Sequence, residues 1–130
     1  MELQQIFNTV STHLLTQNHK STAIGFPDYA GMCAYRGNNG ASCAIGCLIP
    51  AAAYNSSMEG QNLSDAAVWA AVYPVIGSGF IDLYTNNAKF ELLWKLQQLH
   101  DFGAVCEWPE RLQELADDFE LTFTPLTERN

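Results

Sequence analysis

Apolar residues recur with a helical period in three stretches of this chain. From residue 3 to about residue 17 they stand at i, i+3, i+4, i+7 and i+11, with polar residues between them, which is the pattern of an amphipathic helix. A wider apolar stripe predicts the longest helix over about residues 86–101, ended by Gly103. A third such helix opens at Trp108-Pro109, since proline suits the first turn of a helix.

The middle of the chain is less regular. Residues 66–73 predict a helix that Ser64 caps and Pro74 stops. Residues 32–35 and 41–43 flank a turn rich in Asn and Gly. This pattern is typical of a β-hairpin, because Gly and Asn tolerate the positive φ that tight turns need.

Beyond the predicted hairpin, residues 43–49 carry no charge and predict a short helix with Ser42 as its N-cap. Pro50 then opens a second turn, and residues 121–125 alternate like a short strand. The predicted fold class is therefore α+β. We expect one mostly helical domain over residues 1–130, with four to five helices and one small β-hairpin.

Composition narrows the class of protein. With 48% hydrophobic and 15% charged residues, the chain is not a disordered polymer. No apolar stretch approaches the ~20 residues of a membrane span, and the first residues have no signal-peptide pattern. We expect a cytoplasmic protein without membrane contact. In that compartment the cysteines are expected to be thiols rather than disulfides; they are Cys33, Cys43, Cys47 and Cys106.

The net charge of −8 is unevenly distributed. Residues 61–130 hold eleven acidic and four basic residues, a balance of −7, whereas residues 1–60 hold three and two, a balance of −1. Nucleic-acid binders have the opposite sign, because their affinity comes largely from neutralising phosphates. We therefore expect no direct nucleic-acid binding and a partner with a basic surface.

Several motifs of this chain recur together in one family. They are Tyr35-Arg36-Gly37, Gly40, residues 43–50, Tyr54, Glu59-Gly60, residues 96–101, Trp108 and the 121–125 tail. The combination resembles small uncharacterised proteins of tailed bacteriophages, prophages and some bacterial genomes. The resemblance implies a phage-type accessory protein of the bacterial cytoplasm and brings no known activity. In many relatives acidic residues follow the proline; Ala51-Ala52-Ala53 stands here instead, so a carboxylate role there does not carry over.

The acidic last helix is the leading candidate site. Within fourteen residues it carries six acids and one base, Arg111. Such a row could imitate phosphates and bind a basic surface on a host or defence protein. The alternative is an ordinary solvated helix face. The partner-binding residues predicted on this helix are Glu107, Glu110, Glu114, Asp117 and Asp118.

The hairpin is the second candidate, as a pocket for a small anionic or nucleotide ligand. Glycines let backbone N–H groups approach an anion, and Arg36 adds a forked donor. The alternative is that the turn only closes the hairpin while Arg36 pairs with Glu59 or with solvent. The residues predicted to bind the ligand are Tyr35, Arg36, Asn38, Asn39, Cys43 and Glu59.

Catalysis and metal binding are the third class. Cys43 at a helix N-terminus could be a nucleophile, with a histidine (His13, His19 or His100) as base and Asp101 orienting it. The alternative is a buried thiol, and no cysteine-hydrolase signature or Cys-x-x-Cys pair occurs. We expect no catalytic residue, no cofactor and no metal. The favoured function is a non-enzymatic accessory protein, with a ligand-sequestering module as the alternative; the broad apolar stripes leave a homo-oligomer open.

Overall fold

The computed structural model describes residues 2–21, 34–37, 40–59, 61, 63, 65–77 and 83–124, with the backbone alone for 83–87. Its α-helices are α1 (Leu3–Gln17), α2 (Ala66–Ile76), α3 (Leu83–Phe102) and α4 (Trp108–Asp118). In the described residues they are accompanied by the single-turn 3₁₀ helices η2 (Gly46–Leu48), η3 (Ser56–Met58) and η4 (Val105–Glu107). The helix predicted over residues 3–17 is confirmed, and α3 extends the predicted 86–101 helix at both ends.

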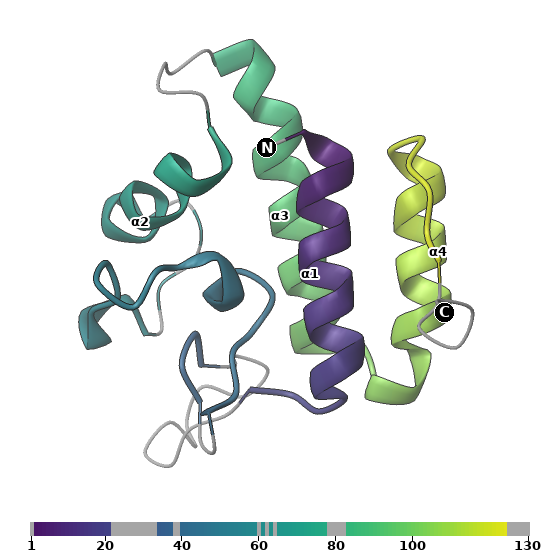
Figure 1. Cartoon of the computed structure of the whole chain (residues 1–130), viewed down its shortest axis with the longest axis horizontal. Helices are drawn as coiled ribbons and strands as arrows, with labels where there is room; N and C mark the ends of the chain where they lie inside the picture. Colours follow the sequence, from purple (N-terminus) through teal and green to yellow (C-terminus); the bar gives the residue numbers. More distant parts are fainter. Residues whose placement is uncertain are drawn as a thin grey trace.

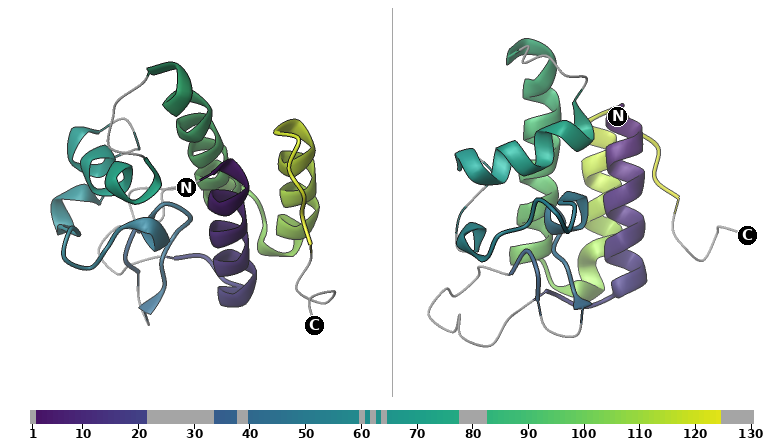
Figure 2. Two further views of the ribbon diagram at one scale, coloured as in Figure 1. Left: turned by 45° about the horizontal axis from the view of Figure 1, so that its top comes forward. Right: turned by 60° about the vertical axis from the view of Figure 1, so that its left-hand side comes forward.

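Helices α1, α3 and α4 contact one another, and Figure 1 shows them side by side. Their apolar faces meet in one core that includes Phe7, Leu96 and Leu112, all without solvent exposure. Burying one such side chain contributes roughly 1.5–3 kcal/mol. Segment 34–59 and α2 lie on the side of α3 away from α4 (Figures 1 and 2). No helix in the described ranges combines the length and the apolar character that crossing a bilayer requires.

Helix α2 begins at Ala66 as predicted but differs from its prediction in the capping residue and in its C-terminal end. Its N-cap is Asp65, whose Oδ1 accepts hydrogen bonds from the backbone N–H groups of Ala67 and Val68; Ser64 lies outside the described residues. The helix also continues through Pro74 to Ile76. Proline costs a helix one backbone donor but already has a helical φ, so the last turn forms and ends at Gly77.

The predicted β-hairpin is wrong, and so is the α+β class. Among the described residues there is no strand or sheet, and pairing is limited to one isolated antiparallel bridge between Arg36 and Ser42. At the described ends of the predicted turn, Gly37 donates a hydrogen bond to the carbonyl of Ala41 (2.8 Å) and Gly40 has a φ of 76°. The fold is mainly helical.

Side chains replace the missing strand partners. The carboxylate of Glu59 accepts hydrogen bonds from the N–H groups of Tyr35 (2.8 Å) and Arg36 (3.1 Å). The side-chain amide of Gln17 both accepts from the N–H of Ser42 and donates to its carbonyl, each at 3.0 Å. Buried backbone groups must be paired. These side chains therefore bind backbone N–H and C=O groups that a neighbouring strand would otherwise bind.

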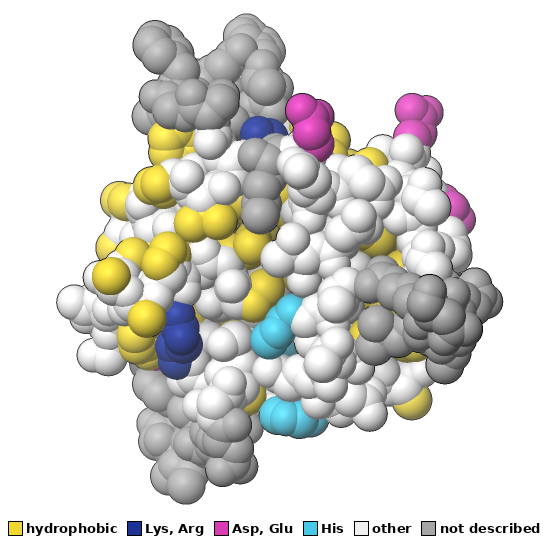
Figure 3. Space-filling model, viewed as in Figure 1, with side chains coloured by type: hydrophobic (Ala, Val, Ile, Leu, Met, Phe, Trp, Pro, Cys, Tyr) yellow, Lys and Arg dark blue, Asp and Glu magenta, His cyan; other side chains and the backbone are white. Residues whose placement is uncertain are grey.

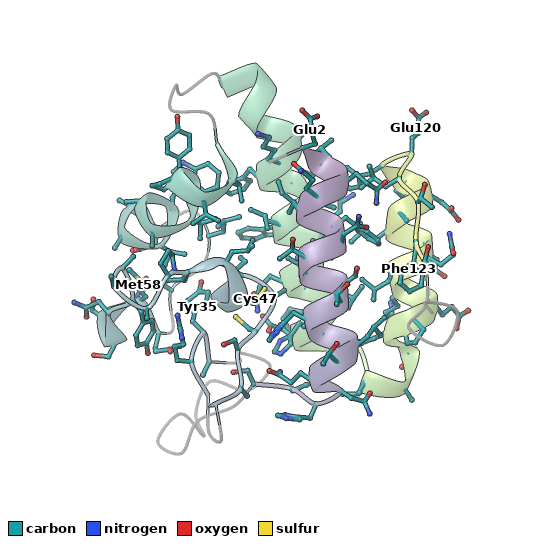
Figure 4. All side chains as sticks on the ribbon, in the orientation of Figure 1. Glu2, Tyr35, Cys47, Met58, Glu120 and Phe123 are labelled. Atoms are coloured by element: carbon teal, nitrogen blue, oxygen red, sulfur yellow. The ribbon has the colours of Figure 1, made fainter. Side chains whose placement is uncertain are left out.

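The C-terminal tail uses the same arrangement. The side-chain amide of Gln4 accepts from the N–H of Thr122 and donates to its carbonyl, both at 2.9 Å. Phe123 packs edge-on against Phe7, with ring centroids 6.0 Å apart. The tail runs back along α4 (Figures 1 and 4). Residues 121–124 are extended without forming the predicted strand, and Pro125 lies outside the described residues.

The predicted helix from Cys43, with Ser42 as its N-cap, is also wrong. A turn leads into the three-residue η2 instead. A Cβ on Gly46 would lie 2.2 Å from the carbonyl oxygen of Tyr35, so the two chain segments cross in direct contact there. Pro50 does open a turn, as predicted: its carbonyl accepts from Ala53 and Tyr54.

Candidate functional site

The structure brings together three of the predicted ligand-binding residues, Tyr35, Arg36 and Glu59. Besides the two backbone N–H groups, the Glu59 carboxylate accepts a hydrogen bond from the Tyr54 hydroxyl (2.7 Å). Desolvation and this hydrogen bond to the carboxylate raise the pKa of Tyr54 to about 12. The acidic side chain therefore serves as an acceptor for its own chain.

The guanidinium of Arg36 is also occupied by its own chain. It donates to the carbonyl of Ile49 and lies over the ring of Tyr54, 5.4 Å from its centroid. Its Nε is buried and has no hydrogen-bond partner among the described residues. Arg36 meets Glu59 through its backbone N–H rather than through a guanidinium ion pair. Asn38 and Asn39 lie outside the described residues.

Cys43 has the properties of a buried structural thiol. It has no solvent exposure, and burial raises the pKa of the thiol well above its ordinary value. Its Sγ accepts a hydrogen bond from the N–H of Gly46 at 3.3 Å. A nucleophile needs an accessible thiolate, so this environment opposes a catalytic role of Cys43. Because the side chain has no solvent exposure, it also opposes the predicted role in ligand binding.

The candidate bases are engaged elsewhere. His13 Nε2 lies 2.8 Å from the Ser42 carbonyl, and His19 Nδ1 lies 3.2 Å from the Lys20 carbonyl. His100 is fully buried, and its Nε2 accepts a hydrogen bond from the N–H of Ser21 at 3.0 Å. Among the described residues, none of these contacts joins a histidine to Cys43.

His100 and Asp101, paired as candidates in the sequence analysis, belong to a wider polar network that the sequence did not indicate. Because its Nε2 is an acceptor, its Nδ1 carries the proton and donates to Asp101 (2.9 Å). Asp101 also accepts from Gln97, which in turn accepts from the N–H of Ile45. The ring of His100 stacks on Trp108, with centroids 5.6 Å apart. The network ties three distant segments together, and no local spacing signals it.

The predicted partner-binding acids of α4 share one property: all five are exposed. The opposite face of the helix is buried through Trp108 and Leu112. Glu107 lies 3.4 Å from Arg111, and Asp117 accepts from Gln113. Within the described ranges the other three carboxylates form no ion pair; they are Glu110, Glu114 and Asp118.

A groove of about 450 Å³ separates α3 from α4. Leu99 and Leu115 line it and are each 7% exposed, whereas Phe102 is 70% exposed. Two of the unpaired acids, Glu114 and Asp118, belong to its wall. The described residues that line the groove are Lys95, Gln98, Leu99, Phe102, Gly103, Arg111, Glu114, Leu115 and Asp118.

Each of the two cations of the groove has an acidic partner four residues earlier in the chain. Lys95 lies 3.5 Å from Glu91 and also over the ring of Phe119, and Arg111 pairs with Glu107. The uncompensated charge at the groove is therefore negative. On the face shown in Figure 3, hydrophobic side chains gather on the α2 side, and acidic ones lie at the top and at the α4 edge.

Across the described part of the chain, no three His, Cys, Asp or Glu side chains converge as metal ligands do; Cys33 lies outside it. Comparison with protein-family models, with curated proteins and with solved structures found no match to this chain. The unpaired acids of α4 and the adjoining groove are the features that remain open to a partner.

Proposed function

We propose that this protein is a non-enzymatic accessory protein that captures a basic segment of another protein on the acidic face of α4. One observation carries the proposal. Glu110, Glu114 and Asp118 are exposed and form no ion pair within the described residues, whereas Lys95 and Arg111 are each paired with an acid. A surface with an uncompensated negative field attracts and orients a positively charged partner.

The resemblance to phage and prophage proteins extends the proposal to a setting. The captured protein would be a host or defence protein in the bacterial cytoplasm whose basic surface α4 occupies. The alternative, a ligand-sequestering pocket in segment 34–59, has weaker support because Glu59 and Arg36 mainly bind groups of their own chain.

The experiment compares variants that remove the same number of charges from different places. E114Q/D118N and E110Q/D117N each remove two acids from α4. The control E2Q/E120Q removes two exposed acids outside the predicted set; Figure 4 labels both residues. The probe is a lysine-rich peptide, and its dissociation constant is measured by isothermal titration calorimetry at low and at physiological salt.

We expect each α4 variant to weaken binding by about tenfold, which corresponds to about 1.4 kcal/mol, and the control by less than about twofold. Equal weakening in all three variants would mean that only net charge matters, and it would overturn the assignment to α4. Failure of the unaltered protein to bind would overturn the proposed function itself.

A further inference from the structure

We propose that the groove between α3 and α4 receives one large apolar side chain of the captured segment. This inference rests on the proposed function and specifies the partner. The partner is then a peptide segment in which an aliphatic or aromatic residue stands among lysines and arginines. A purely cationic segment would leave the groove unused.

The apolar part of the groove supports such an anchor. Leu99 and Leu115 are almost covered, while Phe102 exposes 70% of its surface. It is the large hydrophobic residue that stands out as exposed in the described part of the chain. An aromatic ring in water beside a concave surface gains apolar contact when a partner covers it.

The groove has a suitable size. Its volume of about 450 Å³ falls within the range of roughly 300–1,000 Å³ that ligand pockets occupy. At Gly103, an added Cβ would lie 2.8 Å from the Leu99 carbonyl oxygen and 3.1 Å from Cδ of Arg111. The connection between the helices is therefore closely packed at this residue, which gives the groove a firm boundary.

The charges around the groove specify what flanks the anchor. Glu114 and Asp118 belong to its wall and form no ion pair in the part of the chain that the structure describes. Lys95 and Arg111 are neutralised by Glu91 and Glu107 one helical turn away. A cationic residue beside the anchor would form an ion pair with Glu114 or Asp118, whereas an acidic residue there would be repelled by them. An apolar centre with a charged rim is the usual arrangement of a binding hot spot.

The test uses three peptides of equal length. The first is lysine-rich with a central leucine, the second replaces that leucine by alanine, and the third keeps the leucine and replaces each lysine by glutamate. Binding is measured to the unaltered protein and to Phe102→Ala. The matched control is Val105→Ala, which removes an apolar side chain near the groove but outside its lining. Phe102 is exposed, so its removal should leave the fold intact.

We expect the leucine peptide to bind roughly five- to tenfold more tightly than the alanine peptide. Phe102→Ala should abolish that preference, and Val105→Ala should retain it. Gln98→Lys gives a second, independent readout, since a new cation at the groove should weaken both lysine-rich peptides.

Each other outcome has a defined meaning. If both lysine-rich peptides bind equally and still depend on Glu114 and Asp118, the anchor proposal is overturned while the proposed function stands. If the glutamate peptide binds as tightly as its lysine counterpart, the partner is not basic and both proposals fail. If no peptide binds the unaltered protein, the proposed function is overturned, and with it the anchor proposal that rests on it.

Discussion

Segment 34–59 and helix α4 both carry polar side chains that look functional, and they use them in opposite ways. In segment 34–59, the carboxylate of Glu59 accepts from two backbone N–H groups and from one hydroxyl. On α4, Glu110, Glu114 and Asp118 are exposed and form no ion pair within the described residues. In segment 34–59 the Glu59 carboxylate binds donors of its own chain, whereas three acids of α4 are left for a partner.

The difference follows from burial. Segment 34–59 has few regular backbone hydrogen bonds, so its buried N–H and C=O groups need side-chain partners, and an unpaired one would cost free energy. Helix α4 satisfies its own backbone, and its acids cost little in water. A polar or charged residue therefore indicates a binding site only when its side chain does not already bind groups of its own chain.

The largest expected effect is on Glu59. Glu59→Ala would leave three donors without their acceptor and should lower the free energy of unfolding by roughly 2–4 kcal/mol. Urea denaturation followed by circular dichroism measures it. Glu59→Gln keeps one acceptor oxygen and should cost less. If Glu59→Ala proved as stable as the parent, the Glu59 carboxylate would not be needed by its own chain and would be free for a ligand. The contrast between segment 34–59 and α4 would then be wrong.

The second effect is a loss of stability at alkaline pH. Burial raises the pKa of the Cys43 thiol above its ordinary value, so above about pH 9 the unfolded chain releases a proton that the folded chain keeps. The unfolded state then binds fewer protons, and stability falls by about 1.4 kcal/mol per pH unit for this thiol. Cys47, with its pKa raised to about 12 by burial, acts in the same direction.

Urea denaturation at several pH values tests this expectation. In Cys43→Ala the free energy of unfolding should fall less steeply with pH, because one of the ionising thiols is absent. The same slope in parent and variant would mean that Cys43 ionises in the folded protein, which would restore it as a candidate nucleophile.

The third effect concerns the two glutamines of α1 that hold extended segments. Gln17→Ala and Gln4→Ala should each cost about 1 kcal/mol, because each loses a partly exposed pair of hydrogen bonds. The two positions lie roughly 20 Å apart along the helix, so the double variant should show additive costs. Thr9→Ala, at an exposed α1 position, is the control and should leave stability almost unchanged. A strongly non-additive result would mean that segment 34–59 and the tail unfold as one unit.

The smallest effect is on α4 itself. Removing four acids with E110Q/E114Q/D117N/D118N should change the free energy of unfolding by no more than about 0.5 kcal/mol, although it removes peptide binding. Thermal and urea unfolding of this variant beside the parent measure it. A loss above about 2 kcal/mol would show that these acids hold the fold, as Glu59 does.

The helices that follow from local periodicity could be predicted from the sequence. The apolar spacing predicted α1 over residues 3–17, and the stripe near residues 86–101 predicted most of α3. It also indicated that the acids of α4 would face away from the core, because Leu112, Leu115 and Ala116 share the opposite side. These features follow from the 3.6-residue helical turn and need no distant contact.

Tertiary structure alone decided the rest. Gly37 and Ala41 are hydrogen-bonded at the two ends of the predicted turn. The side chains of Gln17 and Glu59, 25 and 24 residues away from Ser42 and Tyr35, take hydrogen bonds that a hairpin ladder would have used. His100 found its acceptor role 79 residues away, at Ser21. The groove exists because α3 and α4 meet in one particular register. Contacts of this kind arise from packing between segments distant in sequence, which local patterns of residues do not encode.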